Sequence, residues 1–186
     1  MLALIIILVL IVLGVIMFVS MYNSLIKLRN QVKNGWSQID VQLKRRHDLI
    51  PNLIETVKGY MTHERETLQN ITNARSQAMN ATGVKERAKA EGELSGAMSK
   101  FFLVVENYPD LKANQNFLAL QEELTSTEDK ISSSRQNYND QVLFYNNKIQ
   151  TFPTNKMAGM FNFKEENFFK IENKSDREVP PVSFPN

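Results

Sequence analysis

The sequence predicts an all-α protein: an N-terminal transmembrane helix, then an antiparallel four-helix bundle with long helices, then an aromatic-rich C-terminal strap. Two observations carry this prediction. The chain opens on an uninterrupted apolar run, and apolar residues then recur at alternating spacings of three and four. The predicted boundaries are residues 1–22 for the transmembrane anchor, 23–150 for the bundle and 151–186 for the extended strap.

The apolar run is long enough to cross a bilayer. Every residue from Leu2 to Val19 is apolar or glycine, and the first charged residue is Lys27. As a helix this uncharged stretch extends about 35 Å, which exceeds a hydrocarbon core of about 30 Å. No basic segment precedes the run and no small-residue cleavage site follows it, which disfavours a cleaved signal peptide. The first expected partner is therefore the lipid bilayer.

The flanking charges predict the orientation of the span. No Lys or Arg precedes it, whereas Lys27, Arg29 and Lys33 follow it with no acid before Asp40. Positively charged flanks stay in the cytoplasm, so we expect a short N-terminus outside and the helical domain inside. The net charge of +2 is too small to predict a nucleic-acid partner, and the absence of cysteine excludes thiol chemistry.

Beyond the anchor, the apolar spacing predicts helices over most of the chain. The first seam comprises Val32, Trp36, Ile39, Leu43, Ile50, Val57, Leu68, Ile71 and Ala78. The pattern stops at residues 80–83, where Gly83 suits a helix end, and resumes over 84–106. Pro109 followed by an acid is a helix start signal, so the last helix is expected over 109–150.

Pro51 leaves two topologies open. In the first, a hairpin breaks the chain at Asp48–Pro51, with Asp48 capping the second helix and Pro51 in its first turn. In the second, one kinked helix runs from the membrane to about residue 78, because the seam keeps its phase through Pro51. We favour the hairpin, because a single helix would leave Trp36, Ile39 and Leu43 uncovered unless another subunit packed on them.

The C-terminal segment is too rich in phenylalanine for a flexible polar tail. Aromatic residues alternate there with Asn, Lys, Glu and proline, which predicts a strap that docks its aromatics onto a groove of its own bundle or of a neighbour. The predicted anchors are Phe152, Phe161, Phe163, Phe168 and Phe169.

Charged residues also fall on the apolar seams. They are Arg46, Glu64 and Arg75 on the first seam and Glu128 and Arg135 on the last. One interpretation places them at the solvated edge of the seam. The other is a polar layer inside the bundle, in which Glu128 or Glu64 pairs with an arginine and fixes the register of the helices.

No residue pattern predicts catalysis or metal binding. His47 and His63 are the only histidines, and His63-Glu64 lacks the second histidine of a zinc-protease helix. No phosphate-binding loop and no serine–histidine–acid spacing is present. We therefore predict no catalytic, cofactor-binding or metal residues and no enzymatic activity.

Several motifs resemble the LemA family of bacterial membrane proteins. They are Tyr22-Asn23-Ser24-Leu25, Trp36-Ser37-Gln38-Ile39-Asp40, Asp48-Leu49-Ile50-Pro51-Asn52-Leu53, Val57-Lys58-Gly59-Tyr60, Glu106-Asn107-Tyr108-Pro109 and Tyr145-Asn146-Asn147. The resemblance covers the chain from Tyr22 to Phe169. It implies a single-pass protein of the bacterial cytoplasmic membrane with an antiparallel helical bundle, no established enzymatic activity and a membrane-organising role. The chain departs from the family at Gly35, where alanine is usual; glycine there would loosen the helix by about 1 kcal/mol.

Two functional hypotheses follow. The first is a non-enzymatic membrane-anchored scaffold that self-associates as a homo-oligomer and organises a protein assembly or a membrane patch. The second is an adaptor or regulatory subunit of another membrane protein, such as a protease or a sensor kinase. The first predicts a complex of identical chains, and the second predicts a stoichiometric complex with a different protein.

Overall fold

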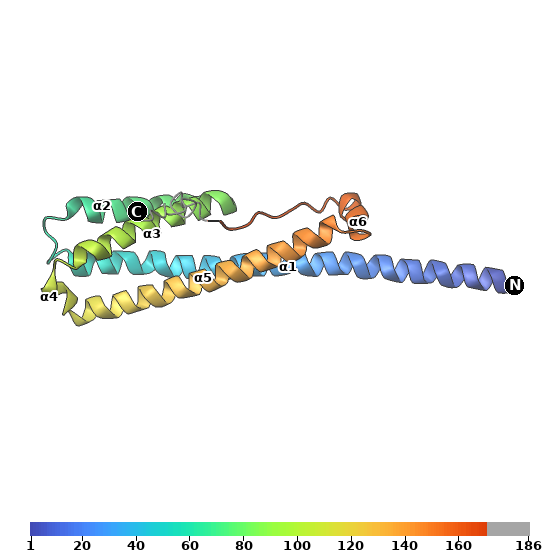
Figure 1. Cartoon of the computed structure of the whole chain (residues 1–186), viewed down its shortest axis with the longest axis horizontal. Helices are drawn as coiled ribbons and strands as arrows, with labels where there is room; N and C mark the ends of the chain where they lie inside the picture. The colour runs from blue at the N-terminus through green and yellow to red at the C-terminus, as the bar shows by residue number, and fades with distance from the viewer. Residues whose placement is uncertain (171–186) are drawn as a thin grey trace, which may run out of the picture. The chain divides into compact units, whose positions relative to one another are not determined.

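A computed structural model describes residues 1–170, and the regular structure of this part is entirely helical (Figure 1). The helices are α1 (Leu2–Val57), α2 (Arg65–Asn80), α3 (Gly83–Val105), α4 (Pro109–Lys112), α5 (Gln115–Gln150) and α6 (Thr154–Met160). The predicted all-α class is thereby confirmed, whereas the antiparallel four-helix bundle stays a prediction. Residues 171–186 of the predicted strap lie outside the described residues.

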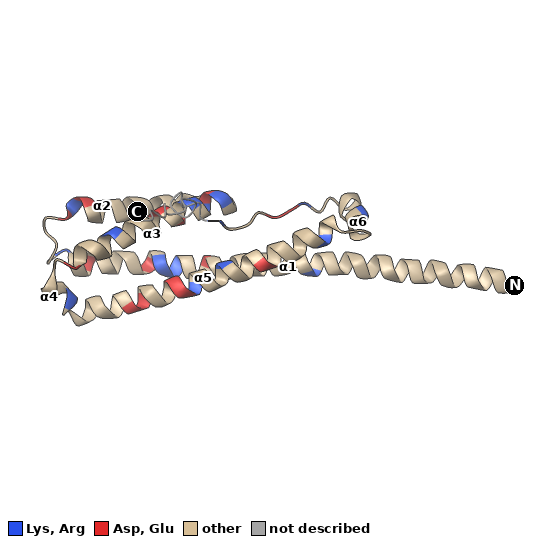
Figure 2. Ribbon diagram, viewed as in Figure 1, with Lys and Arg blue, Asp and Glu red and all other residues tan. Residues whose placement is uncertain are grey.

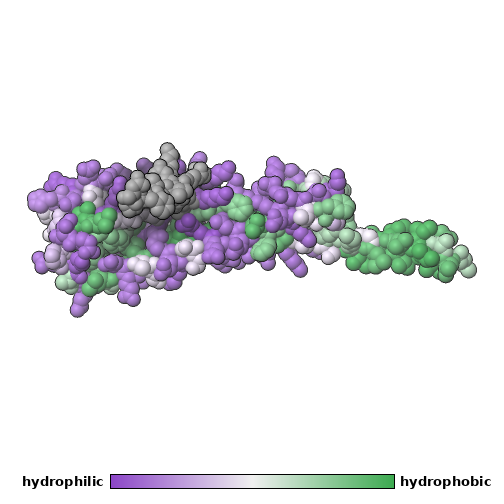
Figure 3. All heavy atoms as spheres, viewed as in Figure 1, coloured by the Kyte–Doolittle hydropathy of each residue, from purple (hydrophilic) through white to green (hydrophobic). Residues whose placement is uncertain are grey.

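The N-terminal part of α1 is the one described segment that is long and apolar enough to cross a membrane. Its most apolar window has a mean hydropathy of 3.6 and none of it is buried. Figure 3 shows this segment as a continuous apolar surface. A helix that exposes apolar side chains on every face cannot be stable in water, and a bilayer supplies the missing apolar surroundings.

Contacts within the chain divide it into two units. The first unit contains residues 1–41 and 131–168, and the second contains residues 42–130 together with Phe169 and Lys170. Two of the three points where the chain passes between the units fall inside the long helices α1 and α5. Each unit is described below by its own contacts.

The second unit has a hydrophobic core built from α1, α2, α3, α4 and α5. Its fully buried members include Ile50, Leu53, Val57, Ile71, Ala78, Leu94, Phe101, Leu111 and Phe117. Burying one such large side chain contributes about 1.5–3 kcal/mol relative to exposing it. Ile50, Val57, Ile71 and Ala78 were predicted seam positions, so the spacing of apolar residues correctly indicated the buried faces of α1 and α2.

The favoured hairpin at Asp48–Pro51 is wrong. Helix α1 continues through both residues and ends at Val57, so neither Asp48 nor Pro51 breaks it. Proline lacks the N–H that would bond to the carbonyl of His47, four residues earlier. That carbonyl instead accepts a hydrogen bond of 2.7 Å from Nε of Arg75. A side chain from α2 therefore replaces the backbone hydrogen bond that is lost at the internal proline.

The alternative of one helix to residue 78 is also only partly correct. A turn separates α1 from α2, and in it the amides of Tyr60 and Met61 both bond to the carbonyl of Val57, at 3.0 and 2.9 Å. Met61 is buried in the core of the second unit. Because Met61 keeps the apolar spacing across the turn, the sequence pattern gave no sign that the helix ends there.

The predicted last helix is split in two. Pro109 begins α4 as expected, but Asn114 stands between α4 and α5. The side-chain oxygen of Asn114 accepts a hydrogen bond of 3.1 Å from the amide of Phe117, which caps the start of α5. This local cap outweighs the continuous apolar pattern around it.

In the first unit, Gly35 allows α1 to approach α5 closely. A Cβ atom at Gly35 would lie 3.2 Å from the Cα of Tyr138, and the ring of Tyr138 packs edge-on against Trp36 with 5.6 Å between centroids. The expectation that glycine merely loosens the helix is thus incomplete, because the missing side chain has a packing role.

We expect Gly35→Leu to lower the free energy of unfolding by about 1–3 kcal/mol, because a large side chain would press on the backbone at Tyr138. Gly35→Ala should stay within about 1 kcal/mol of the wild type, since gained helix propensity offsets a tight contact. Gly96→Leu is the matched control, because a Cβ there meets open space. Unfolding of the full chain in mild detergent, followed by circular dichroism, measures all three. Equal stability of Gly35→Leu and Gly96→Leu would contradict the packing role.

Candidate functional site

Arg46 is the centre of a buried charge cluster in the second unit. Its side chain is 1% exposed and pairs with Glu91 of α3 and with Glu128 of α5. One guanidinium nitrogen also donates a 2.8 Å hydrogen bond to the hydroxyl of Ser95. A buried guanidinium is tolerated only when its charge and its N–H groups find partners. Arg46 thus ties three helices together at one level.

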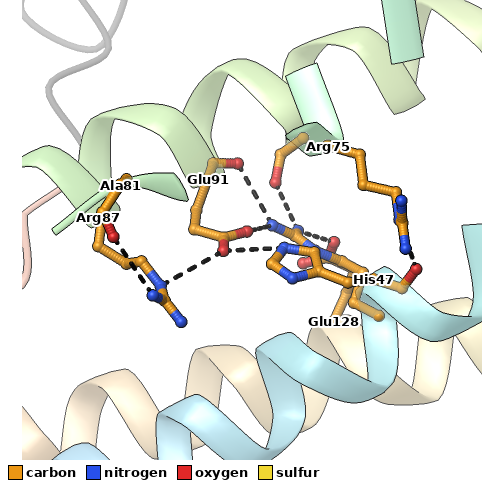
Figure 4. Close-up of polar contacts among 8 residues, drawn as sticks. His47, Arg75, Ala81, Arg87, Glu91 and Glu128 are labelled. Atoms are coloured by element: carbon orange, nitrogen blue, oxygen red, sulfur yellow. Dashed lines mark hydrogen bonds and ion pairs between the residues drawn. The ribbon is translucent and has the colours of Figure 1, made fainter. Parts of the chain in front are cut away.

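Side chains from α1 and from α3 place their nitrogen atoms next to the carboxylate of Glu91 (Figure 4). Nε2 of His47 lies 3.0 Å from its Oε1, and Nε of Arg87 lies 4.0 Å from the same oxygen. Burial acts to raise the pKa of Glu91, but the hydrogen bond from His47 and the positive charge of Arg46 outweigh it and lower the pKa below 4.5. Glu91 is therefore a carboxylate at neutral pH, although its side chain is almost fully buried.

This shift makes stability depend on pH in a defined direction. Because the pKa of Glu91 is lower in the folded chain than its ordinary value of 4.5, its stabilising contribution is complete above that pH. The contribution is lost as the pH falls through 4.5 toward the folded-state pKa. We expect Glu91→Gln to be less stable than the wild type at about pH 7, and the gap to shrink toward about pH 3.

Glu93→Gln controls for general acid effects. Glu93 lies on the same helix, but its side chain is half exposed and its nearest ion-pair partner, Lys89, is 4.0 Å away. Urea unfolding of the full chain at several pH values should give Glu93→Gln the wild-type profile. A stability gap between wild type and Glu91→Gln that does not change with pH would refute the assignment.

The structure brings together only part of the predicted polar layer. Arg46 and Glu128 meet, and Arg75 lies nearby through its hydrogen bond to the backbone of His47. Glu64 instead accepts a 3.1 Å hydrogen bond from the hydroxyl of Tyr108, and Arg135 belongs to the first unit. Of the five, Arg46 and Glu128 therefore form an ion pair, and Glu64 has a different partner.

Sequence reasoning missed Glu91, the acid that Arg46 and His47 share. The signal was present, because Glu91 lies three residues after Ala88 and three before Leu94, on the buried stripe of α3. His47, to which the sequence analysis assigned no role, is also buried. Its position next to Arg46 places it outside the strict apolar seam, so spacing alone did not reveal its burial.

The described part of the strap packs against α1 within the first unit. The ring of Phe161 lies 4.8 Å from that of Tyr22 and 6.1 Å from that of Phe18, measured between centroids. Phe163 contacts Tyr22 at 6.0 Å, and the guanidinium of Arg29 lies 5.1 Å above its ring. Phe161 and Phe163 are thus placed on the chain's own helix, next to the end of the apolar run.

The backbone that follows Phe163 is held by α5. The side-chain amide of Asn146 both donates to the carbonyl of Glu166 and accepts from its amide, each at 2.9 Å. The hydroxyl of Tyr138 donates to the carbonyl of Asn167 at 2.8 Å. Burial and the charge of Glu166 raise the pKa of Tyr138 to about 12, so this donor stays protonated at physiological pH.

The remaining predicted strap anchors differ from one another. Phe169 is buried and belongs to the second unit, and Phe168 is partly buried. Phe152 is 80% exposed, so it does not dock on the chain's own bundle, and the alternative of a neighbouring chain stays a prediction. The strap is also not wholly extended, since α6 occupies residues 154–160.

The buried cluster can hold helices in register, but its geometry offers little for chemistry. Arg46, His47 and Glu91 contact one another and are shielded from solvent. Within residues 1–170, no group of three or more His, Asp or Glu side chains lies close enough to bind a metal ion. The arrangement is typical of structural polar layers, which specify one packing of helices.

The N-terminal part of α1 is apolar and exposed, and it continues into a helical core that contains buried ion pairs. These features are typical of a membrane-associated helical protein. The profile of the LemA family matches residues 35–184, which is most of the chain. The chain belongs to the LemA family, as the motifs around Trp36 and Pro51 predicted.

Known relatives agree with this assignment. Protein LemA of Metamycoplasma hominis is 34% identical over 145 residues, which cover 76% of this chain and 65% of the relative, so this chain spans just under two thirds of that protein. Magnetosome protein MamQ 2 of Paramagnetospirillum magneticum is 23% identical over 198 aligned positions, covering 90% of this chain and 73% of the relative. Magnetosome protein MamQ of Magnetospirillum gryphiswaldense is 20% identical and covers 85% and 68%.

Proposed function

We propose that this protein is a non-enzymatic, membrane-anchored scaffold that self-associates and organises a protein assembly or a patch of membrane. The observation that carries the proposal is the continuity of α1. One helix begins in the apolar run at Leu2 and ends at Val57 in the hydrophobic core of the second unit. No unstructured linker separates the apolar segment from the folded part, as a positioning role requires.

The buried charges support a structural role. Arg46 and Glu91 are the strongest candidates for reactive groups, yet both are almost fully buried and face each other. A catalytic acid or base must reach the substrate proton directly or through one water molecule. The relatives named as magnetosome proteins are in keeping with a membrane-organising role, which the family resemblance also implied.

The proposed location is the bacterial cytoplasmic membrane, crossed once, with a short N-terminus outside and the helical domain in the cytoplasm. Lys27, Arg29 and Lys33 follow the span without an intervening acid, which favours this orientation.

The particle mass of the full chain in mild detergent tests self-association. One chain has a mass of 21.4 kDa, and the proposal predicts particles containing several copies at micromolar concentration. A strict monomer that captures no partner from solubilised membranes would contradict it. A stoichiometric complex with a different membrane protein would replace it with the adaptor function.

A further inference from the structure

An aromatic cluster lies against α1 where the apolar run ends. It consists of Phe18, Tyr22, Phe161 and Phe163, whose rings lie within 4.8–6.1 Å of a neighbour. The run from Leu2 to Val19 spans about 27 Å as a helix, which is close to the thickness of a bilayer core. A span that covers this run would place Phe18 and Tyr22 at the level of the lipid headgroups, where Trp and Tyr are enriched. Their contacts place Phe161 at the same level.

Phe161 directly follows α6, a helix with one buried face and one exposed face. Thr154, Met157 and Ala158 are buried and hold the helix against the first unit. On the outside, Met160 is 73% exposed, next to the exposed Phe161. Phe152, just before the helix, is also exposed. Large apolar side chains are thus presented to the surroundings beside the end of a membrane span.

Basic residues outnumber acidic residues in the part of the chain that carries this surface. Residues 1–39 and 141–164 contain no Asp or Glu, whereas they contain Lys27, Arg29, Lys33, Lys148, Lys156 and Lys164. Figure 2 shows this end of the first unit with basic residues on α1, α5 and α6. Two acids, Glu165 and Glu166, directly follow Lys164. Six basic residues against these two acids still favour an anionic lipid surface, because each basic residue near such a surface contributes to attraction.

We propose that α6 and its flanking residues dock on the anionic surface of the bilayer that holds α1. In this arrangement Phe152, Met160 and Phe161 enter the headgroup region, and Lys156 and Lys164 face lipid phosphates. The proposal rests on the membrane span of the proposed function but goes beyond it. It adds a second, peripheral membrane contact. Attachment at two points restricts tilt and rotation, so this contact would fix the orientation of the first unit relative to the bilayer.

Spin labels at single cysteines test this contact, because the chain has no native cysteine. The full chain is placed in nanodiscs of phosphatidylglycerol and phosphatidylcholine, and label accessibility to oxygen and to a water-soluble nickel chelate is compared. Met160→Cys is the test site. Leu103→Cys is the matched control, since Leu103 is 72% exposed but lies on α3 in the second unit. Leu8→Cys reports on the span itself.

The ratio of oxygen to nickel accessibility should be at least about threefold higher at Met160 than at Leu103, because apolar faces docked on membranes enter the acyl boundary. Lys156→Glu with Lys164→Glu, or nanodiscs of phosphatidylcholine alone, should lower that ratio toward the Leu103 value. No effect of either change would overturn the electrostatic part of the proposal.

Three results would overturn the docking. Equal ratios at Met160 and Leu103, with Leu8 still in lipid, would refute it and leave the membrane anchor intact. Protection of Met160 from both reagents would show a protein partner in place of lipid. Free access of nickel to Leu8 would refute the anchor, and with it the proposed function as well.

Discussion

Arg46→Met is expected to lower the free energy of unfolding by about 3–5 kcal/mol, which is the typical cost of leaving the partner of a buried charge unpaired. Methionine keeps much of the arginine volume, so the loss comes from the charge and its hydrogen bonds. Glu91 would keep only His47 and the more distant Arg87 as neighbours. Glu128 is 42% exposed and could turn to water instead. Urea unfolding of the full chain in mild detergent, followed by circular dichroism, measures the loss.

Arg45→Met is the matched control for this experiment. Arg45 is the adjacent residue and pairs with Glu123, but both side chains are well exposed. Exposed pairs contribute about 0–1 kcal/mol, so Arg45→Met should have a small effect. The double variant Arg46→Met with Glu91→Leu should recover much of the loss, because it removes both buried charges. Equal losses for Arg45→Met and Arg46→Met would show that the cluster has no special role.

The second large effect is expected at Arg75. Arg75→Ala should lower the free energy of unfolding by about 1.5–3 kcal/mol, because a charged donor to a buried carbonyl is lost. That carbonyl, on His47, has no helical partner because Pro51 lacks an N–H. The loss should therefore depend on the proline.

A double-mutant cycle measures this dependence. In the Pro51→Ala background the backbone N–H of residue 51 can bond to the carbonyl of His47, so Arg75→Ala should cost at least about 1 kcal/mol less than in the wild type. Lys44→Ala serves as a control, since Lys44 pairs with Asp48 on the exposed side of the same helix turn. Additive effects of Arg75→Ala and Pro51→Ala would contradict the proposed partnership.

The apolar spacing predicted buried faces well because burial is periodic along a helix. Ile39, Leu43, Ile50, Val57, Ile71 and Ala78 were predicted on one seam, and all are buried. The same periodicity could not locate chain reversals. Met61 continues the spacing through the turn after Val57, and the local cap at Asn114 divides the last helix without disturbing its stripe.

Pro51 shows why local preference was a poor guide here. The penalty of an internal proline is mainly one lost hydrogen bond and a steric clash, and tertiary structure can compensate the first. Arg75, which lies twenty-four positions after Pro51 in the sequence, donates the replacement hydrogen bond. No local pattern around Pro51 contains that information, so the hairpin was a reasonable but wrong prediction.

The charge cluster was predictable only in part, because seam spacing identifies buried charges but does not pair them. Arg46 and Glu128 both lie on seams, and the structure places them in contact. Glu91 also lies on a buried stripe, but an acid among alanine and leucine was not weighed as a partner. Which of several charged seam residues meet depends on how far each helix slides along its neighbours, and single-sequence spacing does not determine that register.

Membrane extraction tests the account most directly. In washed membranes the wild-type chain should resist alkaline carbonate and remain in the pellet. Ile7→Arg with Leu10→Arg should move it to the soluble fraction, because each arginine near the centre of a span costs about 2.5–3.5 kcal/mol. The soluble variant should keep its helical domain, since every side chain from Leu2 to Val19 is exposed in the structure. Release of the wild-type chain by carbonate, as a water-soluble protein with residues 2–19 protected from protease by the helical domain, would contradict the account.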